Sequence, residues 1–218
     1  MIGRAYRNEI APRQVLFRSR AFTQAELQIF FDPSDYAVPL EAVAAERLPM
    51  VSADRRAAGD VTPVHRTPAE LVDAGELPAF YAYHLARSYR FYREVLGYPA
   101  ERIRLYEKSA AERAFYNRIQ FDIEVDLVSL GGFREVGAVH YRGDYDLTRH
   151  GEGAKKDLSV ARPDGRRVIP HVLEITFGVD RNIWALADLG LRTDGDRTVW
   201  RLPSYLAPIA GGVFPLLR

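Results

Sequence analysis

The sequence predicts an α+β fold in which helices flank an antiparallel sheet. Between residues 119 and 127, apolar residues alternate with Gln, Asp and Glu, which is the two-residue period of a strand with one buried face. Residues 2–10 and 15–31 also have strand character, and a proline-containing segment between them predicts a hairpin with a longer loop. Between residues 77 and 96, apolar side chains recur every three or four positions and predict a helix. Strands joined by hairpins, with helices grouped between them, are typical of this class.

Capping signals and shorter patterns place the remaining elements. We expect a helix starting at 67–70, a short helix over 109–116, strands over 133–141 and 168–176, and a helix over 182–189. From Asp32 to about Arg66 neither period persists, so we expect an irregular insertion at about 36–65. The aromatic residues of the 77–96 helix recur on one face, which favours a place in the core over a stacking platform.

Composition narrows the class of protein. The 218 residues carry 30 Lys and Arg against 29 Asp and Glu, so a net charge of +1 creates no overall attraction to nucleic acid or membrane. There is no cysteine, which excludes disulfides and cysteine-bound zinc. No apolar run reaches the roughly 18 residues of a membrane helix, and the first residues lack the apolar stretch of a signal peptide. A cytoplasmic protein that contacts neither membrane nor DNA is expected.

The first two strands have polar faces suited to binding. Residues two apart on a strand point the same way, so Arg7 and Glu9 share a face. Considered without the second strand, these two residues could simply form an ion pair on the protein surface. The second strand presents a longer row of such side chains: Arg18, Arg20, Phe22, Gln24 and Glu26. Arginines bind phosphates, an aromatic ring stacks on a base and a carboxylate binds an ammonium group. The row therefore suits a nucleotide joined to a small amine.

Residues 2–13 and 16–26 resemble motif 2 of the class II aminoacyl-tRNA synthetases, and most of all that of glycyl-tRNA synthetases of the dimeric type. Other segments resemble the same family in the same order. They are 109–116 with 121–124, 132–136, 141–147 with 149–150, the motif 3 segment 170–181, and 207–216. The resemblance covers nearly the whole chain outside the insertion. It implies the antiparallel sheet of a class II catalytic core.

The resemblance also implies roles for individual residues. Arg7, Glu9 and Arg181 would be catalytic, with Arg7 on the α-phosphate and adenine stacked between Phe22 and Arg181. ATP would contact Arg7, Asn8, Glu9, Phe17, Arg18, Arg20, Phe22, Glu135, Val136, Gly178 and Arg181. The amino acid would contact Phe22, Thr23, Gln24, Glu26, Glu174, Thr176 and Gly178. Glu135 and Glu174 would hold Mg²⁺.

The implied reaction activates glycine with ATP and transfers it to tRNA(Gly). No protein base is needed because the attacking carboxylate is already ionised, so catalysis rests on positioning and charge neutralisation. This fits the scattered histidines, 65, 84, 140, 150 and 171, which we interpret as structural. The chain departs from the family at five positions: Ala21, Thr23, Phe133, Ile175 and Thr176 stand where Glu, Glu, Trp, Pro and Ser are usual.

The resemblance also sets expected boundaries. Residues 1–206 would form the catalytic core and 207–218 would begin the link to an anticodon-binding domain. Motif 1 and its dimer interface would precede Met1, so the chain reads as a catalytic fragment truncated at both ends of a homodimeric ligase. Two alternatives remain: a reduced ligase that adenylates a small amino acid for a non-tRNA acceptor, and a non-catalytic accessory protein derived from a synthetase.

Overall fold

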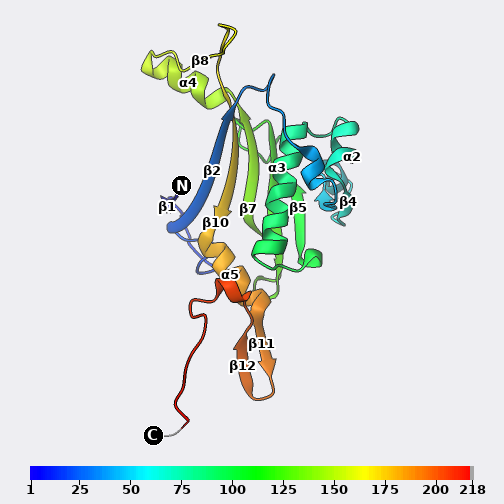
Figure 1. Cartoon of the computed structure of the whole chain (residues 1–218), viewed down its shortest axis with the longest axis vertical. Coiled ribbons are helices and arrows are strands. Elements are labelled where there is room, and N and C mark those ends of the chain that lie inside the picture. The colour runs from blue at the N-terminus through cyan, green and yellow to red at the C-terminus, as the bar shows by residue number, and fades with distance from the viewer. Residues whose placement is uncertain (217–218) are drawn as a thin grey trace.

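One eight-stranded sheet forms the body of the molecule, whose computed structural model describes residues 1–216 (Figure 1). In spatial order its strands are β1 (Ile2–Tyr6), β2 (Ala21–Phe31), β10 (His171–Gly178), β7 (Gly132–Gly143), β6 (Ile119–Leu127), β5 (Ile103–Glu107), β3 (Leu48–Val51) and β4 (Val64–Arg66). Neighbouring strands are antiparallel except β3 and β5, which are parallel. The expected α+β class is confirmed.

Helices and two small hairpins complete the fold. The helices are α1 (Ala53–Ala57), α2 (Pro68–Asp73), α3 (Ala79–Arg90), α4 (Tyr145–Ala154) and α5 (Val179–Gly190). Single turns are η1 (Leu40–Val43), η3 (Ala100–Arg102), η4 (Val128–Leu130) and η5 (Ser204–Leu206), and α3 continues into a π-helical turn, η2 (Phe91–Val95). The hairpins β8 (Val160–Ala161) with β9 (Arg167–Val168) and β11 (Leu191–Asp194) with β12 (Arg197–Trp200) project from opposite ends (Figure 1).

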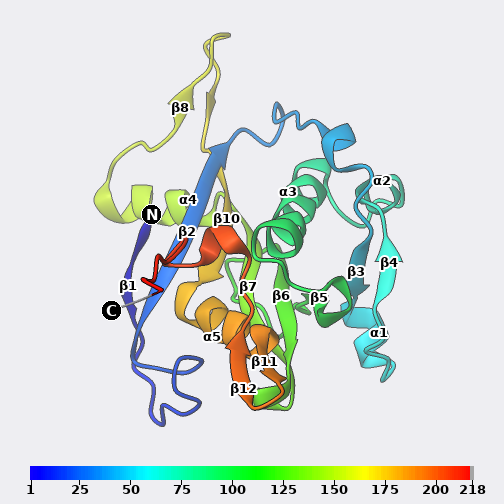
Figure 2. The same ribbon diagram turned by 60° about the horizontal axis from the view of Figure 1, so that its bottom comes forward.

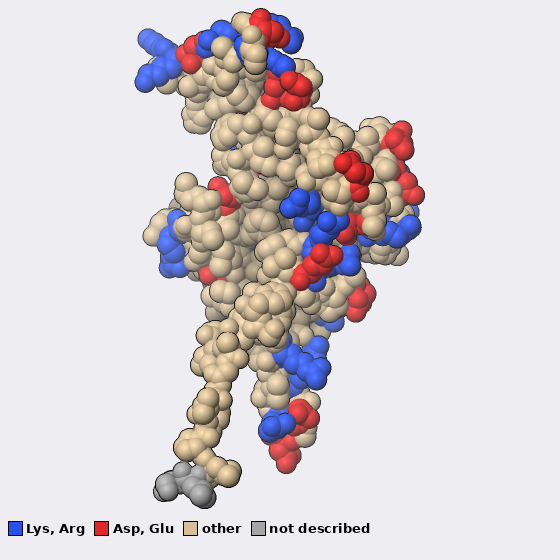
Figure 3. Space-filling view, viewed as in Figure 1, with Lys and Arg blue, Asp and Glu red and all other residues tan. Residues whose placement is uncertain are grey.

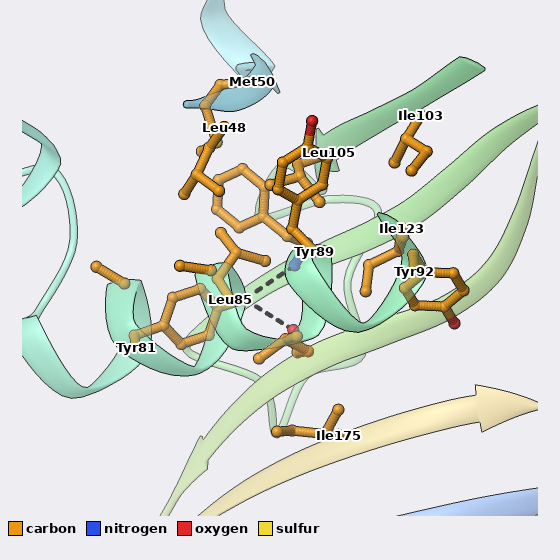
Figure 4. Packing of buried hydrophobic residues seen from close by; sticks show 14 of the residues in the cluster. Leu48, Met50, Tyr81, Leu85, Tyr89, Tyr92, Ile103, Leu105, Ile123 and Ile175 are labelled. Atoms are coloured by element: carbon orange, nitrogen blue, oxygen red, sulfur yellow. Dashed lines mark hydrogen bonds between the residues drawn. The ribbon is translucent and has the colours of Figure 1, made fainter. Parts of the chain in front are cut away.

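The core lies between α3 and one face of the sheet (Figure 2). Figure 4 shows Tyr81, Leu85 and Tyr89 of α3 packed near Leu105 of β5 and Ile123 of β6. The aromatic face of the predicted helix is therefore core, as its spacing indicated. Burial of these large side chains is the main stabilising contribution to the domain.

Tyr81 connects this helix to the backbone of the sheet. Its hydroxyl donates to the carbonyl oxygen of Val139 on β7 at 2.7 Å and accepts from the amide of Phe121 on β6 at 3.0 Å. Phe121 and Val139 face each other in the β6–β7 register. The hydroxyl thus satisfies two polar backbone groups inside the sheet, where an unpaired group would be costly.

The segment predicted as an irregular insertion at 36–65 contains regular elements, so that prediction was wrong. These are η1, β3, α1 and the start of β4, and β3 and β4 extend the main sheet. All four residues of β3 are buried. A short strand buried on both faces shows no alternation, which is why its sequence resembles a loop.

The opening strands are shorter than predicted. β1 ends at Tyr6 and β2 begins at Ala21, so residues 7–20 form a loop in place of the strand ends. Gln14 and Val15 have positive φ angles of 64° and 46°, which no strand accommodates. Arg18 and Arg20 therefore do not share a strand face with Phe22.

The other boundaries show smaller differences. No helix forms over 109–116: the Ser109 amide donates to the Glu112 carboxylate, but Glu112 also binds Arg56 of α1. β10 begins three residues later than expected, and α5 begins three residues earlier than expected. The predicted link 207–218 continues as extended chain to residue 216, and its last two residues lie outside the described part of the structure.

Acidic and basic side chains lie beside one another on the face drawn in Figure 3, and the stretch 204–216 is uncharged there. This agrees with the near-zero net charge. Within residues 1–216 no helix is both long and apolar enough to cross a membrane.

Replacing Tyr81 with Phe removes the hydroxyl and leaves the Phe121 amide and the Val139 carbonyl without their partner. We expect the free energy of unfolding to fall by about 1–3 kcal/mol, measured by urea denaturation. Tyr83→Phe is the matched control on the same helix, since among residues 1–216 the Tyr83 hydroxyl binds only the exposed Arg87. Equal losses in the two variants would contradict the role assigned to Tyr81.

Candidate functional site

A cavity of about 450 Å³ opens on the other face of the sheet. The cause is the two-residue period of the strands. On β10, Leu173 and Ile175 belong to the core, whereas Glu174 and Thr176 line the cavity. The same alternation holds on β7, where Val139 is core and His140 lines the cavity.

Strand register brings the polar side chains of four strands into two rows. Gln28, Glu174, His140 and Gln120 are direct neighbours across β2, β10, β7 and β6. Glu26, Thr176, Ala138 and Asp122 form the adjacent row. We call the part of the cavity around these rows the carboxylate end. The loop end comprises Arg7, Phe17, Phe22, Glu135 and Arg181.

The loop of residues 7–20 is closed by its own hydrogen bonds. The Arg18 Nε donates to the Glu9 carboxylate at 2.9 Å, and the Arg20 Nε donates to the Glu9 carbonyl oxygen at 2.9 Å. The guanidinium of Arg7 lies 5.4 Å from the centre of the Phe22 ring, on β2. The loop therefore presents a cation beside an aromatic face.

Arg181 and Glu135 form the opposite wall of the loop end. The Arg181 Nη1 lies 3.3 Å from the Glu135 Oε1 and donates to the Glu135 carbonyl oxygen at 3.0 Å. Partial enclosure by the cavity wall, with the nearby Asp122 carboxylate, raises the pKa of Glu135 although 45% of its side chain is exposed, and Arg181 opposes the shift. The Arg181 guanidinium also lies 5.7 Å from the Phe17 ring.

A buried pair behind this wall sets its position. The Asn182 Nδ2 donates to the Val136 carbonyl oxygen at 3.0 Å and to the Gly178 carbonyl oxygen at 2.9 Å. The Tyr98 hydroxyl donates to the Asn182 Oδ1 at 3.0 Å and thereby fixes the amide orientation. Because Asn182 follows Arg181 directly, this clamp holds the start of α5 against β7.

At the carboxylate end, Glu174 is already paired. Its Oε2 accepts from the Arg142 Nη1 at 2.6 Å and from the Gln28 Nε2 at 3.3 Å. Arg142 also binds Asp146, and its guanidinium lies 4.3 Å from the centre of the Tyr116 ring. Glu26 accepts from the Gln24 Nε2 at 3.0 Å.

Thr176 narrows the cavity floor. This residue is only 7% exposed, and its hydroxyl lies 3.5 Å from the Ala138 carbonyl oxygen. Beneath it, a Cβ atom at Gly137 would lie 2.6 Å from the Thr176 carbonyl oxygen and would also collide with the hydroxyl of the buried Tyr92. Glycine at position 137 therefore lets β7 pack closely against β10 and the core.

A chain of hydrogen bonds links three members of the two rows, Asp122, Gln120 and His140, through Asn117. The Lys108 ammonium lies 3.3 Å from Asp122, which accepts from Gln120 at 2.9 Å. The Gln120 side chain contacts Asn117 at 3.0 Å, and Asn117 contacts the His140 Nδ1 at 3.1 Å. Burial lowers the pKa of His140 to about 4, so the ring is neutral near pH 7.

Comparison with known proteins identifies relatives whose sequence similarity extends over all or nearly all of this chain. It is 30% identical to the glycine–tRNA ligase of Methanothermobacter thermautotrophicus over all of this chain and 51% of that protein. The glycine–tRNA ligase of Thermococcus gammatolerans is 29% identical over 99% of this chain and 51% of its own length. That of Aeropyrum pernix is 28% identical over all of this chain and half of its own length. The resemblance to glycyl-tRNA synthetases is confirmed.

The chain spans about half the length of these glycyl-tRNA synthetases, and no protein-family model matches it. The fold agrees with the relationship. A prolyl-tRNA synthetase from Cryptosporidium parvum, solved with L-proline and AMP, superposes with a TM-score of 0.56 at 16% identity. The superposition covers 95% of this chain and 32% of that one. The sheet is thus a class II aminoacyl-tRNA synthetase catalytic fold.

Most residues that the glycyl-tRNA synthetase resemblance singled out line the cavity. The exceptions are Asn8, which does not line it, and Arg20, whose side chain is used to close the loop. Sequence reasoning missed several lining residues: Gln28, Tyr116, Gln120, His140, Arg142 and Asp180. Gln28 continues the series 22, 24 and 26 on β2, and His140 and Arg142 are two residues apart on β7. The two-residue period of a strand could therefore have identified these three residues.

The two predicted Mg²⁺ ligands differ in availability. Glu135 keeps a 45% exposed side chain at the loop end, which suits a metal bound mainly by substrate phosphates. Glu174 is committed to Arg142 and Gln28. Among residues 1–216 there is no cluster of three or more His, Asp or Glu side chains placed to hold a metal.

The neutral state of His140 has a consequence for stability. A buried neutral histidine has a lower pKa in the folded chain than its ordinary 6.5, so the unfolded chain binds more protons as the pH falls from 6.5 towards 4. We expect His140 to remove at most roughly 2 kcal/mol of stability between about pH 7 and pH 5. Urea unfolding of the native chain and of His140→Gln at both pH values measures this, and the variant should show the smaller loss.

An NMR titration gives the same pKa directly. A midpoint for the His140 ring near 6.5 in the folded chain would contradict the prediction. His84 provides a comparison away from the cavity, because burial lowers its pKa to about 4 as well and its ring contacts the Tyr36 hydroxyl at 2.8 Å.

Proposed function

We propose that this chain carries the adenylate-forming site of a glycine–tRNA ligase: ATP and glycine react in the cavity and the glycyl group passes to tRNA(Gly). The observation that carries the proposal is the layout of one continuous cavity. Its loop end has arginines and an aromatic ring for a nucleotide, and its carboxylate end has acidic groups for an ammonium. The names of the relatives favour this function over a ligase for another acceptor or a non-catalytic accessory protein.

The loop end suits ATP. Phe22 and Arg181, which both line this end, would stack on the two faces of adenine, and Arg7, whose guanidinium lies 5.4 Å from the centre of the Phe22 ring, would bind the α-phosphate. Phe17, Arg18 and Glu9 line the same end, with Val136 and Gly178 in the floor. The AMP bound to the superposed prolyl-tRNA synthetase supports a nucleotide in this fold.

Mg²⁺ belongs to the same proposal. Glu135 would hold it at the loop end, where it would neutralise phosphate charge when bound. Glu174 fits this role poorly, because Arg142 already neutralises its carboxylate. We assign Glu174 to the amino-acid end instead.

The carboxylate end suits the amino acid. Glu26 would accept the ammonium group. Glu174 would be the second acceptor through its Oε1, because Arg142 and Gln28 both bind its Oε2, and Thr23 and Gln24 would contact the amino acid beside Glu26. Thr176, with its methyl group in the floor, leaves little depth there, which favours the smallest amino acid. One missing methyl group gives modest selectivity by itself, about 10- to 200-fold.

The reaction needs position and charge from the protein. A carboxylate oxygen of glycine attacks the α-phosphorus, a new P–O bond forms, and the bond to the leaving pyrophosphate breaks in line. Arg7 neutralises charge on the phosphorus oxygens during this step. A hydroxyl of the 3′-terminal ribose of tRNA then attacks the glycyl carbonyl carbon and forms a new C–O bond. The C–O bond to AMP breaks, AMP leaves with its electrons, and the hydroxyl proton passes to the leaving phosphate.

The proposal extends to the surroundings of the site. Residues 1–206 are the catalytic core, and the apolar stretch from 207 leads to a further domain. A homodimer of the full-length protein, as expected for the family, would cover the sheet edge at β1, which pairs only with β2 among the described strands. Since the product serves translation, we place the protein in the cytoplasm.

Glycine-dependent exchange of labelled pyrophosphate into ATP tests the proposal. Arg7→Ala removes the cation on the α-phosphate, and we expect the exchange rate to fall by about 100-fold or more. Transfer of labelled glycine to tRNA(Gly) is the second readout, and it distinguishes tRNA from any other acceptor.

Arg192→Ala is the matched control. Arg192 lies on the β11–β12 hairpin, and its guanidinium contacts only the neighbouring Leu191 carbonyl oxygen among described residues. The control should exchange like the native chain. If the native chain binds ATP by calorimetry but shows no glycine-dependent exchange, the assignment to glycine activation fails.

A further inference from the structure

His140 contributes a side chain to the cavity that the proposed function does not use. It sits on β7 between Glu174 of β10 and Gln120 of β6 in the strand register. Its row lies one step further from Phe22 than the row that contains Glu26 and Thr176. The ring therefore borders the amino-acid end on the side away from the nucleotide.

Hydrogen bonds behind the ring determine which nitrogen carries the proton. The Asp122 carboxylate only accepts, so it fixes the Gln120 amide with Nε2 as the donor, at 2.9 Å. The Gln120 Oε1 must then accept from the Asn117 Nδ2, at 3.0 Å. The second hydrogen of that same nitrogen is directed at the His140 Nδ1, at 3.1 Å.

The His140 Nδ1 is consequently an acceptor, and in a neutral ring the proton is on Nε2. If the Asn117 amide were turned over, its oxygen would face the Gln120 oxygen, and two acceptors would meet. The orientation with the Asn117 Nδ2 toward Gln120 is therefore favoured, even though the Asn117 Oδ1 has no partner among described atoms. The Lys108 ammonium lies 3.3 Å from Asp122 and holds this carboxylate at the start of the chain of hydrogen bonds.

The His140 Nε2–H is a free donor within residues 1–216, since the ring has no other hydrogen bond there. Neighbouring donors are committed. The Gln28 Nε2 and the Arg142 Nη1 both donate to Glu174. A donor of fixed direction beside a ligand site favours an oxygen acceptor or a water molecule at that point.

We propose that His140 is a specificity-determining residue, whose fixed Nε2–H rejects amino acids with an apolar side chain at the carboxylate end. The inference rests on the proposed function. Glycine leaves room for a water molecule on Nε2, so the donor stays satisfied. The methyl group of alanine would displace that water and leave the donor unpaired, which adds about tenfold discrimination to the loss from size.

Binding of unreactive aminoacyl-adenylate analogues tests this without catalysis. Calorimetry with glycyl-, alanyl- and seryl-sulfamoyl adenosine measures each Kd on the native chain. We expect the alanyl analogue to bind more weakly than the seryl analogue, although serine is larger, because its hydroxyl oxygen can accept from Nε2–H. An order set by size alone, with seryl weakest, would overturn the proposal.

Two variants sharpen the test. His140→Leu keeps much of the side-chain volume and removes the donor, so the ratio of alanyl to glycyl Kd should fall about tenfold. Asn117→Ala retains His140 but removes the hydrogen bond to its Nδ1, so the ring is no longer fixed. The ratio of alanyl to glycyl Kd should fall in this variant too. His84→Leu is the control for loss of a buried neutral histidine outside the cavity, and its ratio should equal the native value.

The ring itself provides a readout independent of binding. Long-range ¹⁵N–¹H NMR spectra of the native chain, with His140 assigned from its loss in His140→Leu, should show the Nε2–H form near pH 7. An Nδ1–H form would overturn the proposal. Failure of all three analogues to bind would refute the proposed function itself, whereas binding with an unchanged ratio in His140→Leu would refute only the role of His140.

Discussion

The alternation of side chains along four adjacent strands is the constraint on which the rest of the structure depends. Odd-numbered residues of β10, such as Leu173 and Ile175, pack toward α3, and the even-numbered Glu174 and Thr176 line the cavity. A shift of one residue in any of these strands would exchange the two sets and bury charges in the core. The same register that builds the core therefore also aligns the binding groups in rows.

Two networks of polar side chains stabilise this register. The Tyr98–Asn182 pair ties β7 to the start of α5, and the chain from Asp122 to His140 ties β6 to β7. Such groups are costly when unpaired and stabilising when satisfied, so each network favours a single arrangement. Side chains at both ends of the cavity, Arg181 and His140, are held by them. The site is thus preorganised before any ligand arrives.

Much of the fold could be predicted from sequence where a pattern was long enough. The 119–127 strand alternates over its whole length, and the helix beginning near residue 79 has a continuous apolar face. β3 could not be found because its four residues are all buried. The sequence predicts strand at 7–10 and 15–20, on either side of a turn, because Arg18 and Arg20 have the spacing of a strand face. The positive φ angle of Val15 leaves no such signal in the sequence.

Some residues of the candidate site could also be predicted from the sequence, and others could not. Motif residues such as Arg7, Glu26 and Arg181 were expected from resemblance, and they do lie in one cavity. His140 could not be distinguished from a core histidine, because its role depends on Asn117 and Gln120, which reach it only through tertiary contact. The pairing of Glu174 with Arg142 is equally nonlocal, since 32 positions separate the two residues.

The hydroxyl of Tyr81 has a consequence for dynamics. Because it accepts the Phe121 amide hydrogen from within the β6–β7 pair, that amide can exchange with solvent only when the helix moves away from the sheet. The exchange rate of this one backbone hydrogen, which lies beneath the ligand site, therefore reports how often the core between α3 and the sheet opens, and with it how long the cavity on the opposite face stays formed.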